Sequence, residues 1–437
     1  MNRQEAEDFI YKSYLKAEKY QDYNAKDSKK RRPDLTYDLI RARAKTPAVV
    51  ITGSKGKGSV AAMVAQVLQG SLNVGLMTSP HLTNFCQRFK VNGKDISDRA
   101  FTKYVENIQP KIDEIDEALP EDVCISPMGI QAMLALDFFN DSDTDFNIFE
   151  CGKGAKNDDV NNVLHQYGII NKIFLEHTRE LGKTVEEIAA DKAHIITGEQ
   201  KCVYIAAQQP AAYQVIEDRA KRYGTPLKVY GKDFKATDIV FTNKGMKFNV
   251  VIGEKTYRDI IVPLMGAHQA ENCALALALC QDVLGELDTR KIKSCLNNLV
   301  WPGRMQVMSE KPFVLLDACI NKASAEIVKD VITHMGFKQV NTIIGIPDDK
   351  DYLGVAKAME GISKTIILTK SQNVHYVFTT LQQEDLEQHN IESTWIDTVE
   401  GALNKAKTLG GPTVILGTTS VVSEVCKIYE KQRTKTN

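Results

Sequence analysis

The sequence lacks an excess of charge of either sign, and it lacks closely paired cysteines. Its 55 lysines and arginines are balanced by 56 aspartates and glutamates, which argues against nucleic acid or an anionic membrane surface as a partner. The nine cysteines are scattered and none forms a C-x-x-C pair, so the common zinc and thioredoxin-like motifs are excluded. Scattered, unpaired thiols are typical of a reducing compartment.

Long apolar runs are missing as well. No stretch approaches the ~20 apolar residues that a membrane-spanning helix needs. The first residues also lack the apolar core of a signal peptide. We therefore expect a soluble, cytoplasmic protein with no membrane or nucleic-acid partner. With 437 residues, 43% of them apolar, the chain is long enough for two or three domains with proper cores.

The stretch 48–60 organises the rest of the chain. The β-branched run Val49–Ile51 is typical of a buried strand, and the residues from Val60 onward are typical of a helix. Between them lies a loop with three glycines, Gly53, Gly56 and Gly58. Such a loop at a helix N-terminus turns backbone N–H groups towards an anion, Lys57 would reach nucleotide phosphates, and Ser59 would bind Mg²⁺. A glycine-rich loop alone can be a structural turn, but the coincidence of all these features predicts nucleotide binding.

Polar side chains follow three further strand-like runs. These runs, 74–78, 146–149 and 169–175, lead into Ser79, Glu150 and His177. Helical stretches such as 128–139 separate them, and this alternation favours a doubly wound, mostly parallel sheet. Ligands of such sheets bind beyond the carboxyl ends of the strands. We therefore expect the three side chains to meet the phosphate loop and to form an oxygen-rich magnesium site.

The remaining segments complete the fold prediction. Residues 225–262 show short apolar runs broken by turn residues, which predicts appended β-hairpins. An alanine-rich helix is expected at 270–284, and Pro and Gly mark a boundary at 301–304. Four later runs, 313–317, 342–346, 365–368 and 413–417, predict strands of a second α/β unit. The predicted fold is thus an α/β ATP-binding domain over 1–300 with a small appended β region, followed by a smaller Rossmann-like domain over 301–437.

Three side-chain patterns have an ordinary structural interpretation, and two of them have a functional one as well. In the helical N-terminal segment, Phe9, Ile10, Tyr14 and Leu15 are spaced to form one buried face. Lys192 lies on a predicted helix, where a lysine is usually solvated. Arg304 follows the domain boundary and could bind phosphate bidentately or form a salt bridge within the linker.

Eight motifs in a fixed order give the chain a family resemblance. They occupy 52–59, 78–82, 88–93, 175–182, 187–196, 266–272, 301–304 and 349–351. As a set they are highly specific and extend over nearly the whole sequence. With these motifs the chain resembles the folylpolyglutamate synthase/dihydrofolate synthase family of the Mur ligase superfamily.

The resemblance implies an ATP-dependent acid–amino-acid ligase. The γ-phosphoryl group of ATP would activate a carboxylate as an acyl phosphate, and the amine of an amino acid would displace phosphate. The default substrates are L-glutamate and a folate or dihydropteroate. A site shared by two domains suits this chemistry, because phosphoryl transfer needs positioning and charge neutralisation, and closure would exclude water from the acyl phosphate.

The resemblance also assigns roles to individual residues. The nucleotide would be bound by Gly53, Gly56, Lys57, Gly58, Ser59, Asn272, Arg304 and Asp317. Magnesium would be bound by Ser59, Ser79, Glu150 and His177. The substrates would be bound by Ser79, His81, Asp158 and Asn161. The catalytic set would be Lys57, Glu150, His177, Lys192 and Arg304.

Four of these roles are more specific. Asn272 would lie at the adenine and Asp317 at the ribose, while Arg304 would meet the γ-phosphate. Lys192 matches a lysine that the family carbamylates to help hold a second magnesium ion.

The sequence departs from the family pattern at several positions, among them Lys55, Ala155, Lys156, Glu176, Ile320 and Lys322. The replacement of arginine by Lys156 loses a bidentate fork, and Ile320, in place of a histidine, can neither hydrogen-bond nor carry charge. Two alternatives therefore stay open: a divergent paralogue that uses another acid and amine, or a nucleotide-binding switch or partner protein without ligase activity. We expect a monomer or a small homo-oligomer.

Overall fold

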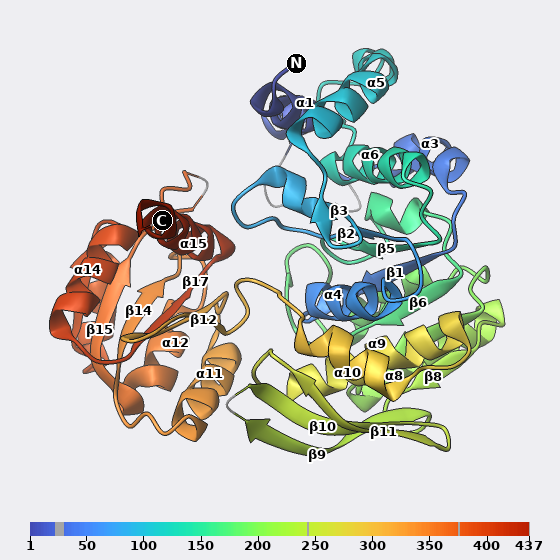
Figure 1. Cartoon of the computed structure of the whole chain (residues 1–437). Helices are drawn as coiled ribbons and strands as arrows, with labels where there is room; N and C mark the ends of the chain where they lie inside the picture. The colour runs from blue at the N-terminus through green and yellow to red at the C-terminus, as the bar shows by residue number, and fades with distance from the viewer. Residues whose placement is uncertain (22–29, 243, 375, 437) are drawn as a thin grey trace.

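The computed structural model describes residues 1–21, 30–242, 244–374 and 376–436. A larger body, which carries the N-terminus, stands beside a smaller body, which carries the C-terminus (Figure 1). No helix within the described ranges is long and apolar enough to cross a membrane.

An eight-stranded sheet forms the centre of the large body, with the strand order β4-β3-β2-β5-β1-β6-β7-β8. The strands are β1 (Ala48–Thr52), β2 (Val74–Met77), β3 (Phe89–Val91), β4 (Lys94–Asp95), β5 (Phe146–Glu150), β6 (Tyr167–Ile170), β7 (Cys202–Ile205) and β8 (Leu227–Val229). The six strands from β2 to β8 in this order pair in parallel, and β3 and β4 add an antiparallel edge. This sheet is the doubly wound core predicted from the sequence.

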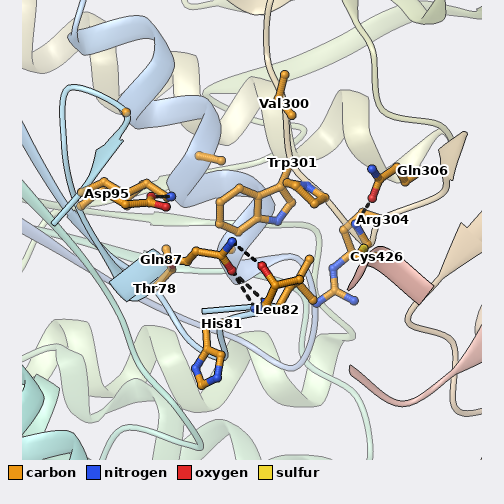
Figure 2. A pocket seen from close by; sticks show the side chains of 18 of the residues that line it. Thr78, His81, Leu82, Gln87, Asp95, Val300, Trp301, Arg304, Gln306 and Cys426 are labelled. Carbon is orange, nitrogen blue, oxygen red and sulfur yellow. Dashed lines mark hydrogen bonds and ion pairs between the residues drawn. The ribbon is translucent and has the colours of Figure 1, made fainter. Parts of the chain in front are cut away.

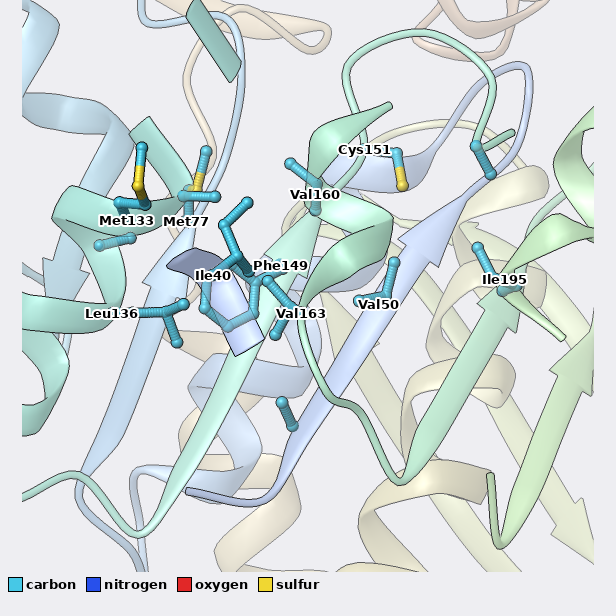
Figure 3. Close-up of a cluster of buried hydrophobic side chains, with 14 of the residues drawn as sticks. Ile40, Val50, Met77, Met133, Leu136, Phe149, Cys151, Val160, Val163 and Ile195 are labelled. Carbon is cyan, nitrogen blue, oxygen red and sulfur yellow. The ribbon is translucent and has the colours of Figure 1, made fainter. Parts of the chain in front are cut away.

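Helices cover both faces of this sheet. They are α1 (Arg3–Glu18), α3 (Tyr37–Arg43), α4 (Lys57–Leu68), α5 (Asp98–Glu117), α6 (Pro127–Asp141), α7 (Val185–Lys192), α8 (Pro210–Tyr223), α9 (His268–Leu284) and α10 (Thr289–Asn297). Alternate residues of β1 join different cores: Val50 packs with Phe149 on one face (Figure 3), whereas Val49 and Ile51 pack with α4 and α9 on the other. Because β1 is buried on both faces, its unbroken β-branched run is what a central parallel strand requires.

A separate antiparallel sheet lies beneath α9 (Figure 1). It consists of β9 (Phe234–Thr242), β10 (Gly245–Ile252) and β11 (Lys255–Val262). Alternate residues of β10 are buried against α9, which explains the period-two pattern of the segment. The prediction of hairpins from 225 onward was wrong at its start, because β8 is a parallel edge strand of the main sheet.

The smaller body contains a six-stranded sheet with the order β12-β13-β17-β14-β15-β16. Its strands are β12 (Gln306–Glu310), β13 (Phe313–Asp317), β14 (Val340–Gly345), β15 (Ser363–Thr369), β16 (Ser393–Ile396) and β17 (Thr413–Gly417). Its helices are α11 (Lys322–His334), α12 (Tyr352–Met359), α13 (Leu381–Gln388), α14 (Val399–Leu409) and α15 (Thr419–Thr436). Strands β13 to β16 pair in parallel, as a Rossmann-like unit does, while β12 and β16 were not predicted. The domain boundary at 300/301 stays a prediction, although the strand pairing changes sheet between β11 and β12.

Two local predictions need correction. Helix α1 buries Ala6, Phe9, Ile10, Ser13 and Ala17, whereas Tyr14 and Leu15 are exposed, so the buried face is turned away from them. The strand expected at 169–175 ends at Ile170. His177 therefore lies in an irregular loop and not directly at a strand end. The cause is that apolar residues such as Ile173 are buried without strand pairing.

Candidate active site

The phosphate loop joins β1 to α4 and contains two glycines with a positive φ angle. Gly53 has φ 142° and Gly56, the N-cap of α4, has φ 79°. A Cβ atom at Gly56 would lie 2.5 Å from Nδ2 of Asn171, so a side chain has no room there. Lys57 opens α4, and its Nζ donates to the carbonyl of Gly53 at 3.1 Å. Ser59 is buried in the first turn of the same helix.

Lys192 approaches the phosphate loop from the end of α7. Its side chain is only 1% exposed, which rules out the solvated helix position considered from the sequence. Its Nζ donates to the carbonyl of Gly53 at 3.0 Å and pairs with Oε1 of Glu176 at 3.0 Å. Burial lowers the pKa of the Lys192 ammonium, and the Glu176 carboxylate opposes that change.

Glu150, the last residue of β5, is buried on the other side of the loop. Its Oε2 accepts a hydrogen bond from the backbone N–H of Ser79 at 3.1 Å. A Cβ atom at Gly58 would lie 3.3 Å from the same oxygen, so the carboxylate faces the first turn of α4. Burial raises the pKa of Glu150, and the nearby Lys57 cation opposes the rise.

The expected magnesium ligands are divided between two neighbourhoods. Ser79 contacts Glu150, but His177 lies in the loop of Glu176, where the charges of Glu180 and Lys192 act on it. Its side chain is exposed and its φ is 45°. The described part of the chain contains no group of three or more His, Cys, Asp or Glu side chains placed to hold a metal ion. A single cluster with His177 therefore is not found, and its ligand role stays a prediction.

The expected adenine and ribose residues lie on either side of the loop. Asn272, in the first turns of α9, accepts from Nδ2 of Asn171 at 2.9 Å and donates to Oε1 of Gln269 at 3.0 Å. Asp317, the last residue of β13, accepts from the backbone N–H of Met305 at 2.8 Å. Burial raises the pKa of Asp317, while the cation of Arg304, which is exposed, opposes the rise.

A cavity of about 710 Å³ lies between the large and the small body. Its lining includes Gly58, Ser79, Glu150, Trp301 and Arg304, so the cavity shares residues with the phosphate loop. Figure 2 shows the Trp301 indole at the centre, with Gln87 and Asp95 on one side and Arg304 and Gln306 on the other. A Cβ atom at Gly58 would lie 2.8 Å from this indole, which explains the need for glycine there.

Two of the expected substrate residues have structural partners. Asp158 is 1% exposed, and its carboxylate accepts from the backbone N–H groups of Gly152, Lys153 and Val160 at 2.7, 3.2 and 3.0 Å. Nδ2 of Asn161 donates to the carbonyl of His194 at 3.1 Å. Both side chains shape the loop after β5, and their expected contact with a substrate stays a prediction.

His81 lines the cavity, but its imidazole points away from Trp301 (Figure 2). Its Nδ1 accepts from Nε of Arg88 at 2.9 Å, so the ring has its proton on Nε2. Burial lowers the pKa of His81 to about 4, and the Arg88 cation adds to the effect. The residue is therefore a neutral hydrogen-bond donor and not a charged one.

Sequence reasoning missed two residues of this site. Glu176 pairs with Lys192, and its place beside His177 was the available signal. Trp301 forms a wall of the cavity, although the sequence analysis gave a role only to Arg304 within the motif 301–304. A tryptophan in a Pro- and Gly-containing linker is a signal for a ligand surface, because linkers seldom bury large aromatic rings.

Comparisons with known proteins agree with this architecture. The Mur ligase middle domain model matches residues 51–280. The dihydrofolate synthase/folylpolyglutamate synthase of Bacillus subtilis is 31% identical over 335 residues, which cover 74% of this chain and 76% of that protein. A probable bifunctional folylpolyglutamate synthase/dihydropteroate synthase of Halobacterium salinarum is 32% identical over 314 residues, but the chain spans only 38% of its length.

A solved structure gives the same result. The crystal structure of Mycobacterium tuberculosis folylpolyglutamate synthase, complexed with ADP and AMPPCP, has a TM-score of 0.84 and 25% identity. The match covers 91% of this chain and 94% of that one. The apo form of the Lacticaseibacillus casei enzyme, at 22% identity and a TM-score of 0.82, supports the fold alone. On the family model and the Bacillus relative together, the chain belongs to the folylpolyglutamate synthase/dihydrofolate synthase family of Mur ligases.

Proposed function

We propose that the protein is an ATP-dependent ligase that activates a carboxylic acid as an acyl phosphate and joins it to an amino acid. One observation carries the proposal. Gly58 of the phosphate loop and Glu150, which faces that loop, both line the cavity between the two bodies, so a nucleotide γ-phosphate and a bound carboxylate would meet at the same place. A transfer from one to the other needs this proximity more than it needs a covalent catalyst.

Each charged group of the site then has a task. Lys57 and the N-terminus of α4 bind the phosphates, because both present positive charge towards the loop. Arg304 lies in the cavity lining beside Glu150 and suits the transferred phosphoryl group. The cavity around Trp301 holds the organic part of the acid. Closure of the two bodies over this cavity would keep water from the acyl phosphate until the amine attacks.

Magnesium fits the residues around Glu150. The Glu150 carboxylate accepts from the backbone N–H of Ser79 and faces the first turn of α4, which carries Ser59. The carboxylate and the two serine hydroxyls are hard oxygen donors. One carboxylate with hydroxyls, waters and nucleotide phosphates is a common set for Mg²⁺. When bound there, the ion would neutralise charge on the phosphates.

Carbamylation of Lys192 fits less well. The Lys192 ammonium donates to the Gly53 carbonyl and pairs with the Glu176 carboxylate. A carbamate would place negative charge against both oxygens, so these residues do not fit a carbamylated Lys192. In the proposal Lys192 is a cation that joins the phosphate loop to the Glu176 loop.

We propose a folate or dihydropteroate as the acid and L-glutamate as the amino acid. The basis is that the similar bacterial proteins are named dihydrofolate synthase/folylpolyglutamate synthase. We also propose the cytoplasm as the location, since all nine cysteines are free and eight are buried. We further propose that the larger body is one domain, residues 1–300, and that the smaller body is a second domain, residues 301–437.

A panel assay tests the proposal. Phosphate release from Mg-ATP would be measured with pteroate, dihydropteroate, folates and simpler acids, each crossed with several amino acids. We expect release that requires a pterin-containing acid and glutamate together. Release with a different pair would point to a divergent paralogue. No stimulated release with any pair, despite measurable ATP binding, would refute the ligase function.

A further inference from the structure

Lys55 is the outermost side chain of the phosphate loop, and it reaches the other body. It lies between the two glycines of positive φ, Gly53 and Gly56, and its side chain is exposed. Its Nζ forms a hydrogen bond with Oγ of Ser324, in the first turn of α11, which is 269 residues away in the chain. The loop that faces the nucleotide phosphates is therefore also a contact between the two bodies.

The partners of this ammonium group are neutral. The Ser324 hydroxyl donates to Oδ1 of Asn321 at 2.9 Å, so its oxygen is the acceptor for Lys55. The ring centroid of Phe174 lies 6.0 Å from Nζ. No carboxylate in the described segments forms an ion pair with Lys55. A cation with only a hydroxyl and a ring face beside it would exchange the hydroxyl for an anionic oxygen at little cost, because charge-assisted hydrogen bonds are stronger than neutral ones.

The charged groups around Lys55 indicate what kind of anion would bind there. The charges of Arg304 and Asp317 act on Lys55, and Lys57 lies two residues along the loop. The cations Lys55, Lys57 and Arg304 thus face two buried carboxylates, Glu150 and Asp317, each of which already accepts a backbone N–H group. The Glu176 carboxylate also acts on Lys55, but it is paired with the Lys192 ammonium. The excess positive charge at a helix N-terminus fits a polyphosphate.

We propose that Lys55 is a second phosphate-binding residue of the loop, whose ammonium exchanges the Ser324 hydroxyl for a phosphate oxygen when a nucleotide binds. The exchange releases one contact between the loop and α11 at the moment of binding. The inference rests on the proposed nucleotide binding, but not on the identity of the acid or the amine.

Isothermal titration of the full chain with Mg-ADP and Mg-AMPPCP tests the inference. Lys55→Met should weaken the affinity for both nucleotides about tenfold, the size of one charge-assisted hydrogen bond. Lys55→Arg, which keeps the charge, should stay within about threefold of the unaltered protein. Ser324→Ala should leave the affinity unchanged or raise it, because it removes the competing acceptor.

A matched control comes from the same helix turn. Lys322 is exposed, and its ammonium lies 3.8 Å from Oε1 of Glu326, so Lys322→Met should not change nucleotide affinity. Circular dichroism would confirm that each variant is folded. An affinity of Lys55→Met within about twofold of the unaltered protein would overturn the inference. Equal losses in Lys55→Met and Ser324→Ala would also overturn it, because they would indicate a purely structural contact. Absent binding by the unaltered protein would instead refute the proposed function.

Discussion

At the scale of single residues, the most demanding prediction concerns Lys57. It is the only side chain of the first α4 turn that combines a positive charge with a position beside the Gly53 carbonyl. Lys57→Ala should reduce ATP turnover by about a hundredfold or more, because a fixed cation that stabilises transition-state charge is lost. Steady-state phosphate release measures the effect. Turnover within a few-fold of the unaltered protein would show that the loop assignment is wrong.

The buried Asp159 leads to a prediction of how the stability of the fold depends on pH. Its side chain is fully buried, Oδ1 accepts from the Thr36 hydroxyl at 2.6 Å, and Oδ2 has no hydrogen-bond partner among the described residues. Burial raises the pKa of Asp159 to about 6. The folded state thus binds this proton more tightly than the unfolded chain. The stabilising effect of protonation is complete below about pH 4 and is lost as the pH rises through about 6.

Asp159→Asn removes this buried charge. We expect the variant to gain about 2 kcal/mol of unfolding free energy at pH 7.5 and little at pH 4. Urea denaturation at the two pH values measures the difference. The exposed Asp330 of α11 provides the control, since Asp330→Asn should change the unfolding free energy little at either pH value. An Asp159→Asn variant that is less stable at pH 7.5 than the unaltered protein would contradict the argument.

At the scale of elements, the turn from β1 into α4 depends on Gly56 for two separable reasons. Its φ is positive, and a Cβ atom would collide with Asn171 and with Asn272, whose Oδ1 would lie 2.9 Å away. Gly224, the C-cap of α8, also has a positive φ of 65°, but nothing lies within 4 Å of its Cβ position. Gly224→Ala should therefore cost only about 1 kcal/mol of stability.

Gly56→Ala should do more than destabilise. Because the collision moves the loop, we expect Mg-ADP affinity to fall about tenfold or more, whereas Gly224→Ala should retain it. Titration calorimetry and thermal denaturation of both variants separate backbone strain from crowding. Equal nucleotide affinity in the two variants would show that the loop tolerates a side chain.

The elements around the phosphate loop show which features of the site could be predicted from the sequence alone. The strand, loop and helix around Gly56 were predictable, because β-branched runs, glycines and an N-terminal lysine are local signals. The pairing of Lys192 with Glu176 was not, since it depends on how α7 folds back on the irregular loop that precedes it, and that loop carries no regular sequence pattern. For Asp158, the motif suggested substrate contact, whereas only the folded loop reveals three backbone donors on its carboxylate.

At the scale of the whole molecule, the two bodies meet around the cavity through a few separate contacts. Leu82, in the loop after β2, packs into the apolar cluster that contains Val422 of α15. The Phe241 ring lies 6.0 Å from the His334 ring of α11. Leu82 and Trp301 both line the cavity between the bodies. Contacts of this kind between domains permit relative motion, so we expect the cavity to open for substrates and to close for reaction.

Trp301 tests whether this cavity holds the acid substrate. Its indole lies against Gly58 and forms a cavity wall, so Trp301→Ala should raise the KM for the acid about tenfold or more. The KM for ATP should change less than about threefold, since the phosphate loop and Lys57 remain. Val240 of β9, which is 54% exposed and lies outside the cavity lining, provides the control as Val240→Ala. If the KM for ATP rises while that for the acid does not, the cavity serves the nucleotide, and the acid must bind elsewhere between the two bodies.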